Sequence, residues 1–319
     1  MRVLFAGTPG FAVPSLQALC SSTQVAGVLT AQDRCMGRGR RPASMPVSTA
    51  AERLGLKVFR PARIDSRVEE QIRDLRPDVL VSVACGRIFK PRLLDLFPCG
   101  GVNVHPSLLP LHRGVAPIPA AILAGDRETG VTVQRIAEKV DAGDVLAQER
   151  VVLSGTETAS ALSCRLSHLG ASLLVDVLDR LAQGKVCGIA QKEDDASYCT
   201  FVRKEDGRID WSREAVIIDR CIRAYDIWPK AYTVFKGATL SILEGGVYPK
   251  SFPDSSKPVG TILGVDDDCG ILVCCGRGVL FVQRLQLQYR KPADWRSFLN
   301  GYPDLIGAVL GGVDEHTTR

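Results

Sequence analysis

An Asn and a His stand two residues apart at the end of an apolar run, in the stretch "GVNVHPSLLPLHRGVAPI". Side chains two apart on a strand point to the same face, so Asn103 and His105 share one side while the valines preceding each of them take the other. Pro106 lacks a backbone N–H and favours an extended conformation in the residue before it, so the strand is expected to end there. The spacing therefore presents an amide and an imidazole together.

A carboxylate that could join them comes from "EKVDAGDVL". Asp141 and Asp144 flank Ala-Gly in a loop just before a strand pattern, so either could lean into the same crevice. A carboxylate beside an imidazole fixes its tautomer, and an Asn amide can donate to a developing oxyanion. Asn, His and Asp together suit acyl transfer without a protein nucleophile. The pattern also allows a structural His105 and an ordinary Asp-containing turn.

The elements that must position these residues follow from hydropathy. Apolar runs alternate with amphipathic stretches, which indicates βαβ units around a parallel sheet, and ligands of open α/β sheets bind beyond the carboxyl ends of the strands. We expect strands at 3–7, 25–30, 78–84, 101–105, 130–136 and 144–152, and helices at 47–54, 66–75 and 158–183, the last stopped by Gly184.

The period changes in the second part of the chain. The stretch 185–211 is polar and is expected to run across the surface as a connection. A helix pattern at 213–225 is followed by short apolar runs at 231–245, 259–264, 270–275 and 278–287, separated by Gly, Asp and Pro turns. The expected fold class is α/β, a Rossmann-like parallel-sheet domain (1–190), then a linker (191–208) and a smaller, mostly β, barrel-like domain of the oligonucleotide-binding type (209–319).

Composition agrees with a folded chain of two domains. The chain has 319 residues, of which 45% are hydrophobic and 24% charged. No apolar run approaches the roughly 18 residues that cross a bilayer, and the first strand pattern leaves no room for a signal peptide. Eleven cysteines without CxxC pairing indicate reduced thiols and no metal site. We expect a cytoplasmic monomer that does not contact a membrane.

The positive charge is unevenly placed. The formal net charge is +5, and the excess lies before residue 206, partly in the Gly-rich stretch "DRCMGRGRRP", which has no helical or strand period. Arginines on such a loop can follow phosphates and order on binding, although a solvated loop has the same composition. Arginines further along the chain could also be phosphate contacts or solvated faces. The candidates are Arg34, Arg38, Arg40 and Arg41 in the loop, and Arg208, Arg220 and Arg223 beyond it.

Five stretches in order resemble the folate-dependent formyltransferases: "FAGTP", "NVHPSLLP", "HRGVAPI", "AGDRETGVTV" and "DAGDVL". The resemblance implies a Rossmann-like domain that transfers a formyl group from 10-formyltetrahydrofolate to an amine. It makes Asn103, His105 and Asp141 the catalytic residues, with Asp144 a structural neighbour. Asn103 and protonated His105 would stabilise the oxyanion, and Asp141 would orient His105. The implied co-substrate is 10-formyltetrahydrofolate, without a metal.

The resemblance also implies a folate site. The folate of this family lies along the strand end and loop that read "VACGRIFKP" here, and next to the loop of the N-x-H motif. The sequence departs from the family pattern in four places: Cys85 replaces the usual Tyr, Gly10 an Asp, Pro106 a Gly, and Leu111-His112 a basic-aromatic pair. None of these departures removes a catalytic group. The implied folate contacts are Cys85, Gly86, Ile88, Ser107, Leu108, Leu109 and Pro110.

The acceptor is indicated by other stretches. "QDRCMGRGRRPASMPV" resembles the basic inserted loop of the family members that act on methionyl initiator tRNA, and "DGRIDWS" and "CIRAYDIWPKAY" resemble the start of their C-terminal domain. This implies initiator methionyl-tRNA as partner, for translation initiation. A nucleotide-linked amino sugar is the alternative acceptor, and a folate- or RNA-binding protein without turnover is the non-enzymatic alternative. "GTPGFA" lacks the G-x-G-x-x-G spacing of a dinucleotide oxidoreductase.

Overall fold

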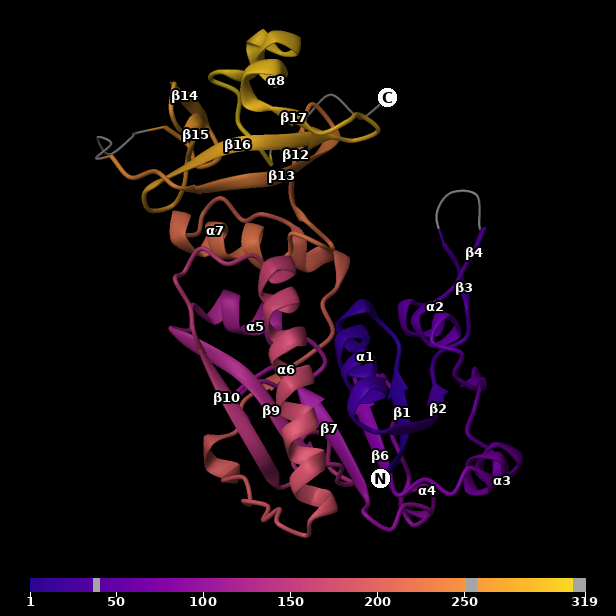
Figure 1. Cartoon of the computed structure of the whole chain (residues 1–319). Helices are drawn as coiled ribbons and strands as arrows, with labels where there is room; N and C mark the ends of the chain where they lie inside the picture. The colour runs from indigo at the N-terminus through magenta and orange to yellow at the C-terminus, as the bar shows by residue number, and fades with distance from the viewer. Residues whose placement is uncertain (37–40, 251–256, 312–319) are drawn as a thin grey trace. The chain divides into compact units, whose positions relative to one another are not determined.

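The computed structural model describes residues 1–36, 41–250 and 257–311, in two compact units (Figure 1). The first unit comprises Met1–Ile118, Arg127–Leu153 and Ala161–Thr200, and the second comprises Pro119–Asp126, Ser154–Ser160 and Phe201–Arg319. Of the residues 191–208 expected to form a linker, 191–200 therefore belong to the first unit and the others to the second.

A mixed sheet forms the centre of the first unit. In the described residues it has seven strands in the order β10-β9-β7-β6-β1-β2-β5, and the strands from β7 to β5 are parallel. β6 is buried along its whole length, as expected for an apolar strand covered on both faces. The strands are β1 (Arg2–Gly7), β2 (Gln24–Leu29), β5 (Val58–Phe59), β6 (Val79–Val83), β7 (Gly101–His105), β9 (Glu128–Arg135) and β10 (Val145–Val152).

The sheet is mostly parallel, and its antiparallel pairings involve β9. β9 pairs antiparallel with both β7 and β10. The short connection 136–144 allows the antiparallel pairing of β9 with β10, whereas parallel neighbours need a crossover of about a dozen residues or more. Because of the antiparallel direction, Arg135 at the end of β9 lies beside Val102 near the start of β7. The loop that follows begins at the opposite end of β7 from His105.

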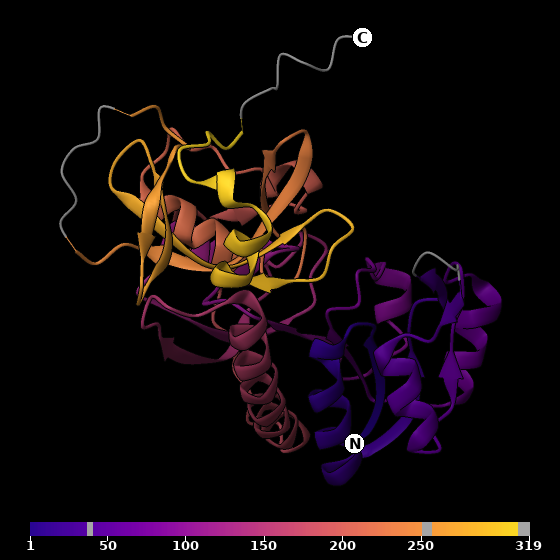
Figure 2. The same cartoon turned by 90° about the horizontal axis from the view of Figure 1, so that it is seen from above.

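Helices flank this sheet, and α6 is the longest of those described (Figures 1 and 2). They are α1 (Val13–Ser22), α2 (Pro46–Arg53), α3 (Ser66–Asp74), α4 (Pro91–Leu94) and α6 (Ala159–Ala182). A further helix, α5 (Pro117–Ala124), begins in the first unit and ends in the second. The predicted stop of α6 is confirmed, since Gly184 follows it with a left-handed φ of 67°.

α6 covers the valine face of β7. Gly170 lies so close to the sheet that a Cβ there would be 2.9 Å from a methyl of Val104 and 3.2 Å from one of Val131. α6 is long and apolar enough for a membrane span by length and composition, although the sequence showed no uninterrupted apolar run of that length. Of its most apolar window 44% is buried, including Leu166 and Leu174 at 0% exposure, so one face of α6 packs into the core. Asn103 and His105 are left to the opposite face.

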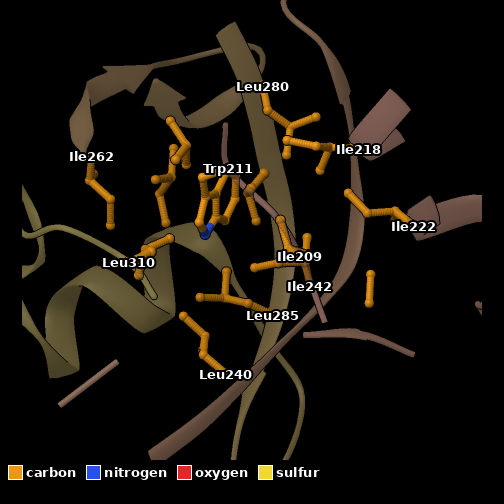
Figure 3. Packing of buried hydrophobic residues seen from close by; sticks show 14 of the residues in the cluster. Ile209, Trp211, Ile218, Ile222, Leu240, Ile242, Ile262, Leu280, Leu285 and Leu310 are labelled. Atoms are coloured by element: carbon orange, nitrogen blue, oxygen red, sulfur yellow. The ribbon is translucent and has the colours of Figure 1, made fainter. Parts of the chain in front are cut away.

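The second unit is an antiparallel sheet with a helix packed on it. Its strand order is β12-β13-β16-β15-β14, with β17 paired to β16, and α7 contacts β13 and β16. Figure 3 shows the core, where the indole of Trp211 is surrounded by aliphatic side chains and its Nε1 donates to Thr233 Oγ1 at 3.0 Å. The elements are α7 (Ala215–Ala224), β12 (Ala231–Phe235), β13 (Ala238–Val247), β14 (Ile262–Asp266), β15 (Gly270–Cys274), β16 (Val279–Leu287), β17 (Ala293–Asp294) and α8 (Trp295–Gly301).

The expected fold class is confirmed: an α/β unit with a mostly parallel sheet precedes a smaller, mostly β unit. The structure adds short strands that the sequence did not reveal. β3 (Arg34–Met36) pairs antiparallel with β4 (Arg41–Ala43) in the stretch that showed no strand period, and β8 (Arg113–Gly114) pairs with β11 (Tyr198–Cys199). Such pairing uses main-chain N–H and C=O groups, so it needs no apolar periodicity.

Candidate active site

Asp141 lies at the centre of the predicted catalytic residues. Its Oδ1 accepts hydrogen bonds from Gln134 Nε2 at 2.9 Å and Asn103 Nδ2 at 3.4 Å. Its Oδ2 accepts the Gly114 N–H at 2.9 Å and lies 3.6 Å from His105 Nδ1. An ionised carboxylate is a pure acceptor with room for several donors, which fits this surrounding. The structure thus brings the three residues predicted from the sequence together.

The turn that carries Asp141 is shaped by steric limits. Asp141 has a left-handed φ of 52°, which Asp and Asn tolerate better than most residues. A Cβ at position 143 would lie 1.9 Å from the carbonyl oxygen of Arg135, so this position requires Gly. Asp144 is exposed and contributes its main-chain carbonyl, which accepts the Arg135 N–H at 2.9 Å. The residue pattern allowed either aspartate and the family resemblance implied Asp141; in the structure Asp141 is the one of the two that is turned toward the imidazole.

His105 is enclosed by protein on both ring nitrogens. The residue is 4% exposed, and its Nε2 lies 2.9 Å from the carbonyl oxygen of His112. A carbonyl only accepts, so Nε2 carries the hydrogen, and a neutral ring then turns the Nδ1 lone pair toward Asp141. Burial lowers the pKa of His105, while the attraction of Asp141 acts in the opposite direction. The ring nitrogen that can take a further proton is therefore Nδ1, which faces Asp141.

The predicted folate loop follows β6. Val83 pairs with Val104, so the loop leaves the sheet next to the strand that ends in His105. Gly86 has a left-handed φ of 69°, with nothing within 4 Å of where a Cβ would lie, and Ile88 is 78% exposed. Cys85 instead packs into the core, where burial raises the pKa of its thiol to about 11.

The loop after His105 is held by hydrogen bonds that buried side chains make to its backbone. Ser107, Leu108 and Leu109 are buried, and Ser107 Oγ donates to the Leu111 carbonyl at 2.6 Å. Thr132 Oγ1 donates to the Ser107 carbonyl at 2.7 Å and accepts the Leu109 N–H at 3.1 Å. Pro110 is half-buried. The buried side chains of this loop therefore shape its backbone. Most of its main-chain groups also have partners: the Leu109 carbonyl accepts Gln148 Nε2 at 2.7 Å, and the Pro110 carbonyl accepts the Ser197 N–H at 3.3 Å.

Sequence reasoning missed two glutamines of the site. Gln134 is 1% exposed and shares the strand face of Thr132, and the alternation of polar residues in "VTVQRI" was a usable signal. Gln191 lies in the stretch interpreted as a linker, and its Nε2 donates to the main-chain carbonyls of Asp141 and Gly143 at 2.9 and 2.7 Å. No periodicity marked it, because it acts from irregular chain.

The predicted RNA-binding arginines lie in different settings. Arg38 and Arg40 lie outside the described residues, and Arg34 and Arg41 stand on β3 and β4. Arg208 is exposed. Within the second unit, Arg220 donates to the Ala124 carbonyl at 3.2 Å, and Arg223 donates to Asp219 and to the Glu157 carbonyl, both at 3.0 Å. The guanidinium groups of Arg220 and Arg223 thus already have partners within their own unit.

Comparison with known proteins decides the family. Residues 1–178 match the formyl transferase family and residues 202–303 match the formyl transferase C-terminal domain. The sequence is 45% identical to a methionyl-tRNA formyltransferase of Treponema pallidum, covering 98% of this chain and 99% of that protein, and 42% identical to one of Roseiflexus castenholzii, covering 98% and 99%. The chain belongs to the methionyl-tRNA formyltransferase family.

Solved structures agree on the fold of this methionyl-tRNA formyltransferase family member. HypX from Aquifex aeolicus in complex with tetrahydrofolic acid superposes with a TM-score of 0.63 at 17% identity, over 96% of this chain and 48% of HypX, so the chain spans about half of that protein. WlaRD, a sugar 3N-formyl transferase, gives a TM-score of 0.64 at 17% identity, over 91% and 99%. The chain is a formyltransferase, and the one-carbon donor of its family is 10-formyltetrahydrofolate.

Proposed function

We propose that Asn103, His105 and Asp141 catalyse formyl transfer from 10-formyltetrahydrofolate to the α-amino group of methionyl initiator tRNA, giving N-formylmethionyl-tRNA. The observation that supports this most directly is the Asp141 carboxylate, held by Asn103, Gln134 and the Gly114 N–H beside a buried imidazole. The near full-length identity to methionyl-tRNA formyltransferases supports the choice of acceptor.

Asn103 is proposed to stabilise the oxyanion. As the amine attacks the formyl carbon, negative charge develops on the formyl oxygen. One hydrogen of Asn103 Nδ2 is directed to Asp141 at 3.4 Å, and the other is available for that oxygen. A donor fixed before the reaction needs no reorganisation when the charge appears, and removal of one such donor typically costs about 10²- to 10³-fold in rate.

Asp141 and His105 are proposed to take the proton that the attacking amine loses. The ionised carboxylate and the neutral imidazole together carry one negative charge, and they can share one added proton across the 3.6 Å between Oδ2 and Nδ1. The proton ends on the pair, the nitrogen keeps its new bond to the formyl carbon, and the bond from that carbon to the folate nitrogen breaks. The pair then gives this proton to the folate nitrogen, which returns Asp141 and His105 to their starting protonation states.

The loop after β6 is proposed to hold the pterin through Gly86 and Ile88, with a contribution from the loop of residues 107–110. We propose that Arg34, Arg38, Arg40 and Arg41 of the first unit and Arg208 of the second contact the RNA. We also propose that the second unit is the tRNA-binding domain. Translation initiation places the acceptor in the cytoplasm, where we propose that the enzyme acts as a monomer.

The acceptor is tested by single-turnover formylation with 10-formyltetrahydrofolate and two competing acceptors, charged methionyl initiator tRNA and a nucleotide-linked amino sugar, at about 50 and 200 mM salt. We expect formylated methionyl-tRNA, formed at subsaturating enzyme at a rate that drops at the higher salt because phosphate contacts release counterions. Formylation of the sugar alone would replace the acceptor and retain the catalytic residues. Absence of any formylated product would overturn the enzymatic proposal.

The pH dependence follows from His105. Because a neutral imidazole is the working form, activity is lost as pH falls through the pKa of His105, which burial lowers below its ordinary value of about 6.5. Activity should therefore hold or rise between pH 6.5 and 8, and an NMR titration of the His105 ring should show a midpoint below 6.5. Activity that falls as pH rises through this window would instead make the protonated ring the working form.

A further inference from the structure

Gln191 joins the two parts of the chain that hold the Asp141 carboxylate. On one side its Nε2 donates to the carbonyls of Asp141 and Gly143 at 2.9 and 2.7 Å, and lies 3.3 Å from Gln134 Oε1. On the other side its Oε1 accepts Arg113 Nε at 3.0 Å. The side-chain amide of Gln191 thus links two elements: its NH2 group donates to the Asp141 turn, and its oxygen accepts from Arg113 on the strand β8.

Arg113 is itself fixed. It is 1% exposed, and its Nη1 donates to Glu193 Oε2 at 2.9 Å and to the hydroxyl of Tyr198 at 2.8 Å. Pairing of β8 with β11 places Arg113 opposite Tyr198 along the main chain as well. The next residue, Gly114, supplies the N–H that reaches Asp141 Oδ2 at 2.9 Å. The backbone that holds the carboxylate is therefore anchored through Arg113.

The turn on the other side is also tied to the segment of Gln191. Val145 and Ile189 exchange main-chain hydrogen bonds of 2.8 and 2.9 Å just after the turn. Lys139, just before Asp141, pairs with Glu193. Asp141 has a left-handed backbone, which persists only where its surroundings hold it. Donation to the carbonyls of both Asp141 and Gly143 supplies such a restraint from outside the turn.

We propose that Gln191 is a positioning residue that fixes the Asp141 carboxylate against His105 and Asn103. The proposal rests on the proposed function, since it assigns Gln191 to the same reaction. Gln191 needs no contact with substrate for this role: it sets where the carboxylate stands. A misplacement of about 1 Å in a catalytic group can cost on the order of 100-fold in rate, so the effect is expected in kcat rather than in KM.

The test replaces Gln191 with Met, which is of similar length and provides neither strong donors nor strong acceptors. We expect Gln191→Met to lower kcat by about 10- to 100-fold, with KM for both substrates within about threefold of wild type. The matched control is Gln183→Met, since Gln183 is exposed beyond the end of α6. Thermal unfolding of both variants confirms that the assay temperature lies well below the melting temperature.

A second measurement, the NMR titration of the His105 ring, needs neither substrate. Because Asp141 raises the pKa of His105, a displaced carboxylate should move the NMR titration of the His105 ring in Gln191→Met to lower pH, and Gln183→Met should leave it in place. A kcat within about twofold of wild type, or an unmoved titration, overturns the positioning role. If the wild-type chain formylated no methionyl-tRNA, the proposed function would fail while the titration still decided whether Gln191 places Asp141.

Discussion

Replacement of Asp141 by Asn is expected to lower the single-turnover rate of formyl transfer by about 10³- to 10⁴-fold, the upper part of the range for a catalytic acid or base. Asn tolerates the left-handed backbone at this position, so the change tests the carboxylate rather than the turn. The NH2 group of the substituted Asn has to face either Asn103 and Gln134, or the Gly114 N–H and the imidazole. Three of those four groups donate to Asp141 in the structure, so a donor meets a donor in either orientation.

The matched control is Asp144→Asn in the same loop. Asp144 is exposed and contributes its main-chain carbonyl, which the substitution keeps, so we expect a rate within about threefold of wild type. Chemical-quench measurement at saturating substrates separates the chemical step from binding. Equal losses in the two variants would show that the loop as a whole, and not the Asp141 carboxylate, is needed.

Replacement of His105 by Gln should lower the same rate by about 10³-fold, since the imidazole shares the proton with Asp141. The two groups act as a unit at 3.6 Å, so their effects should not add. We expect the double variant His105→Gln with Asp141→Asn to be within about tenfold of the slower single variant. Full additivity of the two losses would mean that the groups act in separate steps.

The control for this prediction is His112→Asn. The main-chain carbonyl of His112 contacts His105 Nε2. Asn keeps this carbonyl and tolerates the left-handed φ of 55°. A rate within about threefold of wild type is expected, measured in the same quench experiment. A loss as large as that of His105→Gln would assign chemistry to the His112 ring.

Much of the fold was predictable because it rests on local patterns. The strand 101–105 coincides with β7, and the long amphipathic stretch 158–183 coincides with α6 (Ala159–Ala182), including its stop before Gly184. Apolar periodicity and Gly at a left-handed position are properties of neighbouring residues, so a single sequence carries them. The short strand pairs β3 with β4 and β8 with β11 were missed, because their hydrogen bonds are made by main-chain groups common to all residues.

The sequence by itself predicted the candidate catalytic groups. Residue type and strand alternation indicated Asn103, His105 and one of two aspartates, and the family resemblance implied Asp141. Only the tertiary structure shows that Asp141 faces the imidazole, which nitrogen of His105 meets a carbonyl, and that Gln191 contacts the Asp141 turn. These depend on the antiparallel return of β9 and on contacts such as Gln191 to Asp141, fifty residues apart. Contacts between distant residues leave no period in the sequence, because they form only when the chain has folded.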